Sequence, residues 1–182
     1  MRRAVAGAVL VLVAAALAMA ADGSIDAGHS TIAATFKQES VPVEAPFRKF
    51  SGRIVFDANN PAGATASIDV ETGSLDIGDP AYNAEVRKPA WFDSAAFPFA
   101  SFRSTAVKAI SATRFEASGK LFIKGRSLDI TVPITIVAAG GSTAFEGTLP
   151  VSRKAFGIGD PVWNDVLDDM VSVRFHLVNS AH

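Results

Sequence analysis

The sequence predicts an all-β fold of eight antiparallel strands, arranged as a closed up-and-down barrel or as a two-sheet sandwich. Eight segments alternate apolar and polar residues with a period of two, which is typical of strands with one buried face. Short turns separate most of these segments, and short turns connect antiparallel neighbours. The 182-residue chain has no cysteine and 49% hydrophobic residues, so an apolar core must hold the fold without disulfides.

The eight predicted strands are residues 29–38, 50–57, 64–71, 99–107, 115–123, 127–137, 145–151 and 171–178. The pattern is clear in 127–137, where the apolar Ile130 and Val132 alternate with the polar Thr131. A Lys-Gly-Arg sequence at 124–126 marks a tight turn between two of the strands. We therefore expect the strands to pair mainly with their neighbours in the chain.

Two longer stretches interrupt the alternation. Within the first, residues 72–96, we predict about two turns of helix at 80–88. Residues 89–104 contain five aromatic residues and two prolines, so they cannot form one regular element. We interpret them as a helix end, a corner at the barrel mouth, and a strand that begins near Phe99. The second interruption is residues 153–169.

Residues 1–20 have the features of a cleavable secretory signal peptide. Arg2 and Arg3 precede an apolar run, and an A-x-A cleavage site follows at 18–20. The run is shorter than the ~20 residues of a membrane-spanning helix, so we favour export over membrane anchoring. We expect one domain over residues 21–182, in the periplasm and not integral to the membrane. Cleavage would change the formal net charge from −1 to −3, which does not favour nucleic acid as a partner.

The sequence carries no constellation of residues that supports catalysis. The motifs HExxH, CxxC and GxSxG and a glycine-rich phosphate loop are absent. We therefore predict a protein that is not an enzyme and has no metal or cofactor. An acidic cluster, Asp160, Asp165, Asp168 and Asp169, offers oxygen ligands for Ca²⁺. Its spacing matches no EF-hand loop, and we interpret these residues as solvated loop charges.

Alternation alone leaves open whether the predicted barrel is filled or hollow. An eight-stranded barrel can be filled by its own side chains or can hold one small ligand. Small residues occupy many inward positions: Ala34, Gly52, Ala66, Ala100, Ser104, Ala106, Ala117, Gly119 and Gly147. They either leave an elongated apolar space or interlock with large inward side chains. A hollow barrel would be a binding protein, whereas a solid one would be a structural or interaction module acting through loops such as 38–46.

Several motifs, in their order and spacing, resemble the YceI family of exported lipid-binding proteins. They lie at residues 26–30 (DAGHS), 47–57 (FRKFSGRIVFD), 73–78 (GSLDIG), 91–93 (WFD), 119–125 (GKLFIKG) and 156–159 (FGIG). The resemblance implies a lipocalin-like eight-stranded antiparallel β-barrel with one short helix near its mouth. It also implies that a long isoprenoid or similar amphiphile, such as a polyprenyl phosphate or a quinone tail, binds in the barrel interior. Some members of the family pair up, which leaves a homodimer open.

The sequence departs from the family pattern at positions that bear on the ligand. Many members carry His where Gln38 stands and Arg-Asp where Tyr82 and Asn83 stand. An aromatic residue is common at the position of Ala34, and Thr at that of Phe122. A His or Arg would suit a phosphate head group, whereas Gln38 and Tyr82 are neutral. The departures favour a quinone, a fatty amide or another neutral long-chain molecule.

We predict a ligand-binding site inside the barrel, with an apolar wall and an aromatic entrance. The predicted wall consists of Phe36, Phe50, Phe56, Phe102, Phe115 and Ile134. Trp91, Phe92 and Trp163 lie in the irregular segments and are predicted to line the entrance. Gln38 shares the inward parity of Phe36, and a buried amide needs partners, so it either orients a head group or bonds to loop backbone. The predicted function is the binding, transport or sequestration of a long-chain amphiphile of isoprenoid, quinone or fatty amide type.

Overall fold

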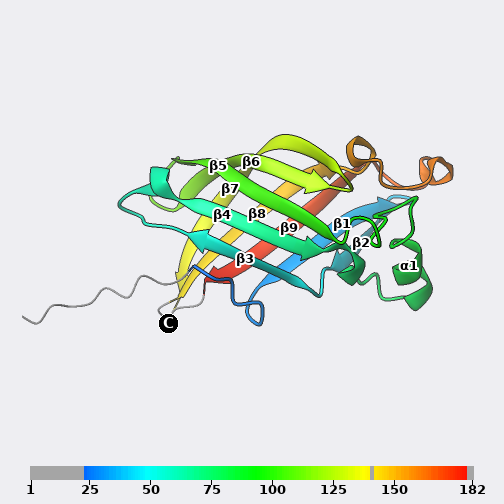
Figure 1. Ribbon diagram of the computed structural model, residues 1–182, viewed down its shortest axis with the longest axis horizontal. Coiled ribbons are helices and arrows are strands. Elements are labelled where there is room, and N and C mark those ends of the chain that lie inside the picture. The colour runs from blue at the N-terminus through cyan, green and yellow to red at the C-terminus, as the bar shows by residue number, and fades with distance from the viewer. Residues whose placement is uncertain (1–22, 140–141, 180–182) are drawn as a thin grey trace, which may run out of the picture.

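The chain forms one antiparallel sheet that curls around an apolar interior, with one short α-helix in the described residues (Figure 1). The structure, a computed structural model, describes residues 23–139 and 142–179. This architecture confirms the all-β antiparallel fold and the short helix that the sequence predicts. The proposed signal peptide, residues 1–20, lies outside the described residues and stays a prediction.

Seven consecutive strands form a meander in which each pairs with the next: β3 (Phe50–Val55), β4 (Thr65–Glu71), β5 (Phe99–Ala109), β6 (Arg114–Ile123), β7 (Arg126–Ala139), β8 (Ser142–Ser152) and β9 (Met170–Asn179). β1 (Thr31–Gln38) pairs with β9, and β2 (Val41–Pro46) pairs with β1. Short helical turns lie between strands: η1 (Pro61–Gly63), η2 (Thr72–Ser74), α1 (Pro80–Glu85), η3 (Lys154–Phe156) and η4 (Pro161–Trp163). The first and last parts of the described chain therefore lie side by side in the sheet.

The sheet has nine strands in the described residues, one more than predicted. The additional strand is β2, which lies in the segment that the sequence suggests is a loop. Glu39 and Ser40 connect it to β1 with φ angles of 49° and 68°. Two successive positive φ angles are typical of a type I′ hairpin turn, which Asn-Gly or Asp-Gly usually marks. Because Glu-Ser carries no such signal, the sequence does not reveal the hairpin.

The edge strands β2 and β3 are not paired in the ladder, and isolated bridges join segments that lie outside the strands to the sheet and to one another. At the end of the molecule near the termini, Ile25 bridges to Asn179, and its N–H donates to the carbonyl of Gly52 at 3.0 Å. At the opposite end, Phe47 bridges to Leu75. These contacts cover edges that would otherwise present unpaired backbone groups.

A β-bulge in β5 changes which of its side chains face inward. The register of β5 with β6 shifts between Ser104 and Ala106. The prediction that Ala106 faces inward is wrong, because its side chain is exposed and Val107 lines the interior instead. A bulge adds one residue to a strand and so reverses the alternation beyond it.

The helix α1 lies within the predicted range and stands at the end of the barrel where the corner precedes β5 (Figure 1). Its N-terminus is capped by Asp79, whose carboxylate accepts from the N–H of Ala81 at 2.7 Å. Pro80 occupies the first turn, where its missing N–H leaves no bond unmade. The corner leads into β5, which begins at Phe99 as predicted.

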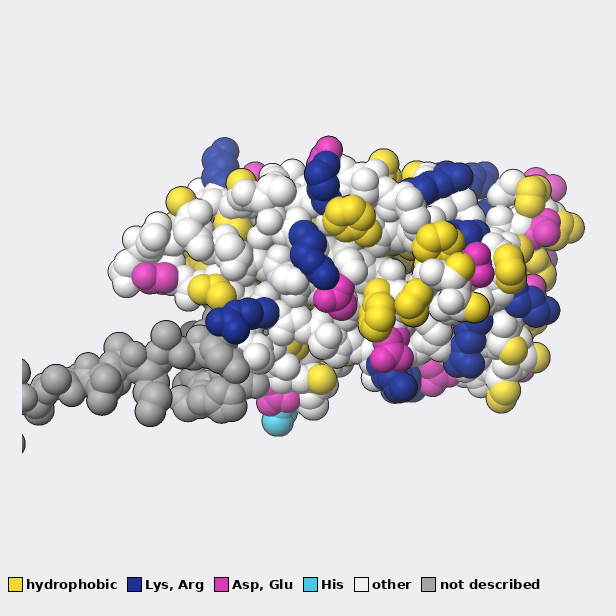
Figure 2. Space-filling model, viewed as in Figure 1, with side chains coloured by type: hydrophobic (Ala, Val, Ile, Leu, Met, Phe, Trp, Pro, Cys, Tyr) yellow, Lys and Arg dark blue, Asp and Glu magenta, His cyan; other side chains and the backbone are white. Residues whose placement is uncertain are grey.

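The outer surface mixes charges of both signs. On the face shown in Figure 2, basic and acidic side chains lie near one another, and hydrophobic ones are more numerous toward the end that carries α1. Ion pairs on neighbouring strands contribute to this pattern, such as Arg103 with Asp69 and Lys120 with Asp129. Among the described residues, no helix combines the length and apolarity that crossing a membrane requires.

Candidate functional site: an apolar cavity with a polar mouth

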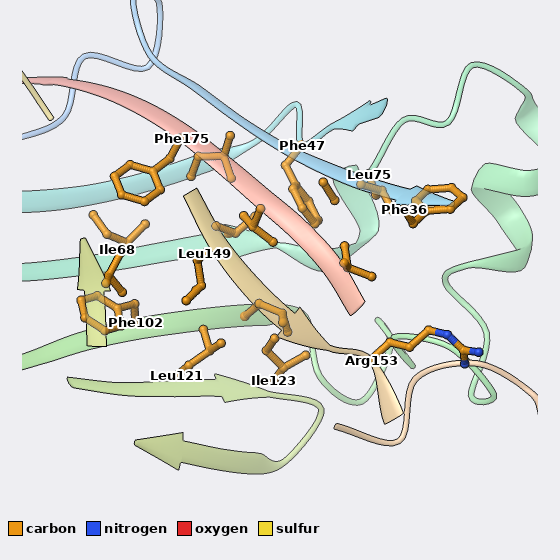
Figure 3. A pocket seen from close by; sticks show the side chains of 18 of the residues that line it. Phe36, Phe47, Ile68, Leu75, Phe102, Leu121, Ile123, Leu149, Arg153 and Phe175 are labelled. Carbon is orange, nitrogen blue, oxygen red and sulfur yellow. The ribbon is translucent and has the colours of Figure 1, made fainter. Parts of the chain in front are cut away.

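The curled sheet encloses a cavity of about 590 Å³ that extends from the barrel interior to the end that carries α1 (Figure 3). All nine strands contribute lining residues, and nearly all of those on the strands are apolar. Most of the polar side chains in the lining gather at the α1 end: Gln38, Asp79, Tyr82, Glu85, Arg153 and Asp168. The cavity is therefore apolar along its length and polar at its mouth.

The small inward residues fall into two groups with different roles. Gly119 and Gly147 interlock with large side chains: a Cβ at Gly119 would lie 2.7 Å from the ring of Phe102, and one at Gly147 would lie 2.5 Å from the ring of Phe175. The inward alanines, such as Ala66, Ala100 and Ala117, line the cavity instead. The sequence leaves open whether the small residues interlock with large side chains or leave an apolar space, and the barrel shows both arrangements.

The size of the cavity argues against a solid core. An apolar cavity of about 150 Å³ in a protein interior holds one benzene molecule, and the cavity here is about four times as large. Well-packed interiors leave few voids larger than a water molecule. A space of this size along a barrel axis is therefore a binding cavity in form, and the solid-core module does not fit it.

Three phenylalanines form the end of the cavity opposite the mouth. The ring of Phe56 packs edge-to-face on Phe115, with centroids 5.1 Å apart, and on Phe145, with centroids 5.8 Å apart. Phe115 and Phe145 are nearly fully buried. Edge-to-face packing is a preferred geometry for aromatic pairs. These three rings, which we call the aromatic floor, close the inner end of the cavity.

Two tryptophans frame the mouth. Trp91 in the corner and Trp163 in η4 both line the cavity, and their ring centroids lie 6.3 Å apart. Trp91 and its neighbour Phe92 also pack against two of the apolar core clusters, one around Leu75 and one around Phe156. The aromatic corner that the sequence predicts at the mouth therefore joins the two sides of the barrel there.

Arg153 is a buried cation at the mouth, with 5% of its surface exposed. Its guanidinium donates to the carbonyls of Ile158, Leu167 and Asp168 and to the side chain of Asn164, at 3.0–3.1 Å. Buried charges need such hydrogen bonds to offset their desolvation. These donors are thus used to hold the loop that carries Trp163 rather than to face the cavity.

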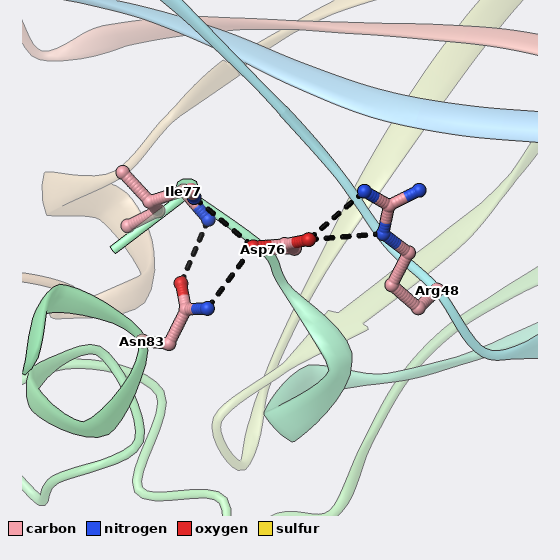
Figure 4. A network of polar contacts seen from close by, with 5 residues as sticks. Arg48, Asp76, Ile77 and Asn83 are labelled. Atoms are coloured by element: carbon pink, nitrogen blue, oxygen red, sulfur yellow. Dashed lines mark hydrogen bonds and ion pairs between the residues drawn. The ribbon is translucent and has the colours of Figure 1, made fainter. Parts of the chain in front are cut away.

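On the other side of the mouth, Asp76 joins α1 to the turn between β2 and β3 (Figure 4). Its carboxylate accepts from the side chain of Asn83 at 3.0 Å and from the guanidinium of Arg48 at 2.9 Å. Asn83 in turn accepts from the N–H of Ile77 at 2.7 Å. The hydrogen bond from Asn83, with those from Arg48 and the N–H of Gly78, lowers the pKa of Asp76 to about 2. Asp76 is therefore ionised at neutral pH and fixes the helix at the mouth.

The structure brings nine of the ten predicted site residues to the cavity. The wall residues Phe36, Phe56, Phe102, Phe115 and Ile134, the entrance residues Trp91, Phe92 and Trp163, and Gln38 all line it. Phe50 does not: it packs against the core cluster that contains Ile54 and Ile68. Gln38 lies at the end of β1, where its backbone bridges to Leu167.

The sequence does not single out some residues that the structure places in the lining. Val43 lies on β2 and shares its parity with Val41 and Ala45, which is the available signal, although Pro42 and two glutamates obscure it. Arg153 follows a strand and precedes a loop, and no local pattern distinguishes a buried arginine from an exposed one there. Its role depends on a loop that folds back over it.

The acidic cluster does not form a metal site in the described part of the chain, where no group of three or more His, Cys, Asp or Glu residues is placed to hold an ion. Two of its members have other partners. Asp160 caps η4 by accepting from the N–H of Val162, and Asp169 accepts from Ser152 and from the N–H of Lys154. These hydrogen bonds place the two carboxylates in local loop structure.

A curled antiparallel sheet around an apolar, ligand-sized cavity defines the class of β-barrel proteins with an internal binding cavity. Residues 24–179 match the YceI-like domain, and the chain belongs to the YceI family. Sequence relatives include a UPF0312 protein of Azotobacter vinelandii, 29% identical over 160 residues that cover 81% of each chain. A UPF0312 protein of Vibrio cholerae is 27% identical over 150 residues, which cover 78% of this chain and 79% of the relative.

Solved structures show the same fold. BcnA of Burkholderia cenocepacia is 37% identical, with a TM-score of 0.83 over 86% of this chain and 99% of its own. A polyisoprenoid binding domain from Saccharophagus degradans is 17% identical, with a TM-score of 0.72 over 87% of this chain and 98% of its own. The second likeness, at this identity, concerns the fold alone.

Proposed function

We propose that the protein binds an apolar-tailed amphiphile in its cavity and carries or sequesters it in the periplasm, without catalysing a reaction. The single observation that carries this proposal is the cavity of about 590 Å³, apolar along its length and polar at its mouth. Burying an apolar tail contributes ~0.8 kcal/mol per methylene. Membership of the YceI family and the likeness to a polyisoprenoid binding domain support an isoprenoid or similar tail.

The mouth favours a neutral head group over a phosphate. The carboxylates of Asp79 and Asp168 belong to residues that line it, and like charges repel an anionic head group, whereas the carboxylate of Glu85 is ion-paired with Lys88. Arg153 is the buried cation there, and four of its five N–H donors bond to the protein's own carbonyls and Asn164. The neutral head group of a quinone, a prenyl alcohol or a fatty amide would not be repelled by these carboxylates and would not require a free cation.

Identification of the bound molecule tests the proposal. The full chain would be expressed with its N-terminal segment in a Gram-negative host, purified gently, and examined by native mass spectrometry and by solvent extraction. We expect an uncharged prenyl or long-chain species in stoichiometric amount, and the mature protein in the osmotic-shock fraction. A protein that is purified empty and that also fails to take up geranylgeraniol or short-chain ubiquinones would contradict the proposal.

A further inference from the structure

The two ends of the cavity differ in how firmly they are built. The mouth consists of α1, the corner and the loop after η3, whereas two of the three floor residues, Phe115 and Phe145, sit on paired strands, and Phe56 directly follows β3 and packs on both of them. Phe115 lies opposite Ile134 in the β6–β7 ladder, and Phe145 lies opposite both Ile136 and Leu177. Ladder-paired backbone in the sheet interior opens far less readily than loops do. The aromatic floor therefore determines the depth of the cavity.

The volume above this floor sets how much ligand can be buried. If about 150 Å³ holds the six carbon atoms of benzene, then about 590 Å³ holds roughly 24 non-hydrogen atoms. A small head group at the mouth leaves about 20 of these atoms for the tail. Four isoprene units have that size.

We propose that Phe56, Phe115 and Phe145 act as a length gauge, so that the protein selects prenyl chains of about four isoprene units. This inference rests on the proposed function and names the ligand class more closely. Each isoprene unit up to the fourth displaces empty volume above the floor and buries new apolar surface. A fifth unit leaves carbon atoms at the mouth, where the polar residues Asp79, Glu85 and Asp168 join the tryptophans in the lining, so it buries less apolar surface than the first four units.

The gauge predicts a break in affinity along a series of prenyl alcohols. Delipidated mature protein would be loaded with the fluorescent probe N-phenyl-1-naphthylamine, and displacement would be measured with geraniol, farnesol, geranylgeraniol and geranylfarnesol, which have two to five isoprene units. We expect affinity to rise about tenfold per added unit as far as geranylgeraniol, and then to level off. An equal gain from geranylgeraniol to geranylfarnesol would overturn the gauge while leaving the proposed function standing.

A matched pair of variants on one segment locates the gauge. Phe56→Ala opens on the order of 100 Å³ at the floor, so the break should move by about one isoprene unit, toward geranylfarnesol. Phe50→Ala is the control, because Phe50 is also a half-buried phenylalanine in the same core cluster but does not line the cavity. In the Phe50→Ala variant, the break in affinity should stay at geranylgeraniol.

A milder substitution covers the case in which Phe56→Ala does not fold. Phe115→Leu keeps an apolar side chain at the floor and should shift the break in the same direction by less. The gauge is wrong if both floor variants fold and keep the wild-type break, or if Phe50→Ala moves it equally. If no prenyl alcohol of any length displaces the probe from the wild-type protein, the gauge is wrong; displacement by short-chain ubiquinones or fatty amides would then leave the proposed function standing, and failure of these ligands as well would overturn it.

Discussion

Replacing Ala100 by Phe tests directly whether the barrel is hollow. Ala100 lies on β5, is half-buried and lines the cavity. A phenyl ring needs about 150 Å³ in an apolar interior, which is about a quarter of the 590 Å³ present. The ring would displace about six carbon atoms of a bound tail. At ~0.3–0.8 kcal/mol for each atom, the loss of binding free energy is about 2–5 kcal/mol, or at least thirtyfold in Kd.

The stability of Ala100→Phe distinguishes a hollow barrel from a filled one. Inserting a ring into existing space should leave the free energy of unfolding unchanged within about 1 kcal/mol, whereas overpacking a filled core costs ~1–3 kcal/mol. Ala106→Phe is the matched control, because the bulge turns Ala106 outward on the same strand. Geranylgeraniol binding and urea unfolding would be measured for both variants. A destabilised Ala100→Phe protein that keeps wild-type affinity would refute the hollow barrel.

Two further predictions concern the frame of the mouth. Arg153→Lys should lower the free energy of unfolding by about 2–4 kcal/mol, because one ammonium group cannot reach all the carbonyls to which the guanidinium donates hydrogen bonds. Urea unfolding should show this loss. The Arg153→Met variant should not be more stable than the Arg153→Lys variant. The pKa of Asp76 is lowered to about 2 in the folded protein, so its ionised carboxylate stabilises the fold. This contribution is fully present above the pKa that Asp76 has in the unfolded chain and is lost as the pH falls through 2. Thermal unfolding from pH 5 to pH 2 should therefore decline less in Asp76→Asn than in the wild type, and parallel curves would contradict the role assigned to Asp76.

Period-two alternation predicts most of the wall because inward parity is a local property. Phe36, Phe102 and Ile134 follow from it without knowledge of the topology. It fails for Ala106, where a bulge that no local pattern announces reverses the alternation. It also cannot distinguish Phe50, which has the correct parity but packs in the core beside the cavity.

The features that the sequence does not predict depend on segments that are distant in the chain. The bridge from Phe47 to Leu75, like that from Ile25 to Asn179, joins segments that no turn connects. The burial of Arg153 requires the loop that ends at Asp168 to fold back over it. Local pattern therefore gives the parity of the wall, while closure of the barrel and the frame of the mouth arise only from tertiary contacts.

The apolar lining also limits how tightly a ligand is held. About 24 buried atoms at ~0.3 kcal/mol each give roughly 7 kcal/mol, or a Kd on the order of 10 μM. With an association rate constant on the order of 10⁶ M⁻¹s⁻¹, release would take place about ten times per second. This rate suits a carrier that exchanges its ligand with membranes better than a permanent store. Transfer of geranylgeraniol from loaded protein to phosphatidylcholine vesicles should accordingly be complete within seconds. A half-time of hours would instead indicate that the mouth frame, held by Arg153 and Asp76, must open before the ligand can leave.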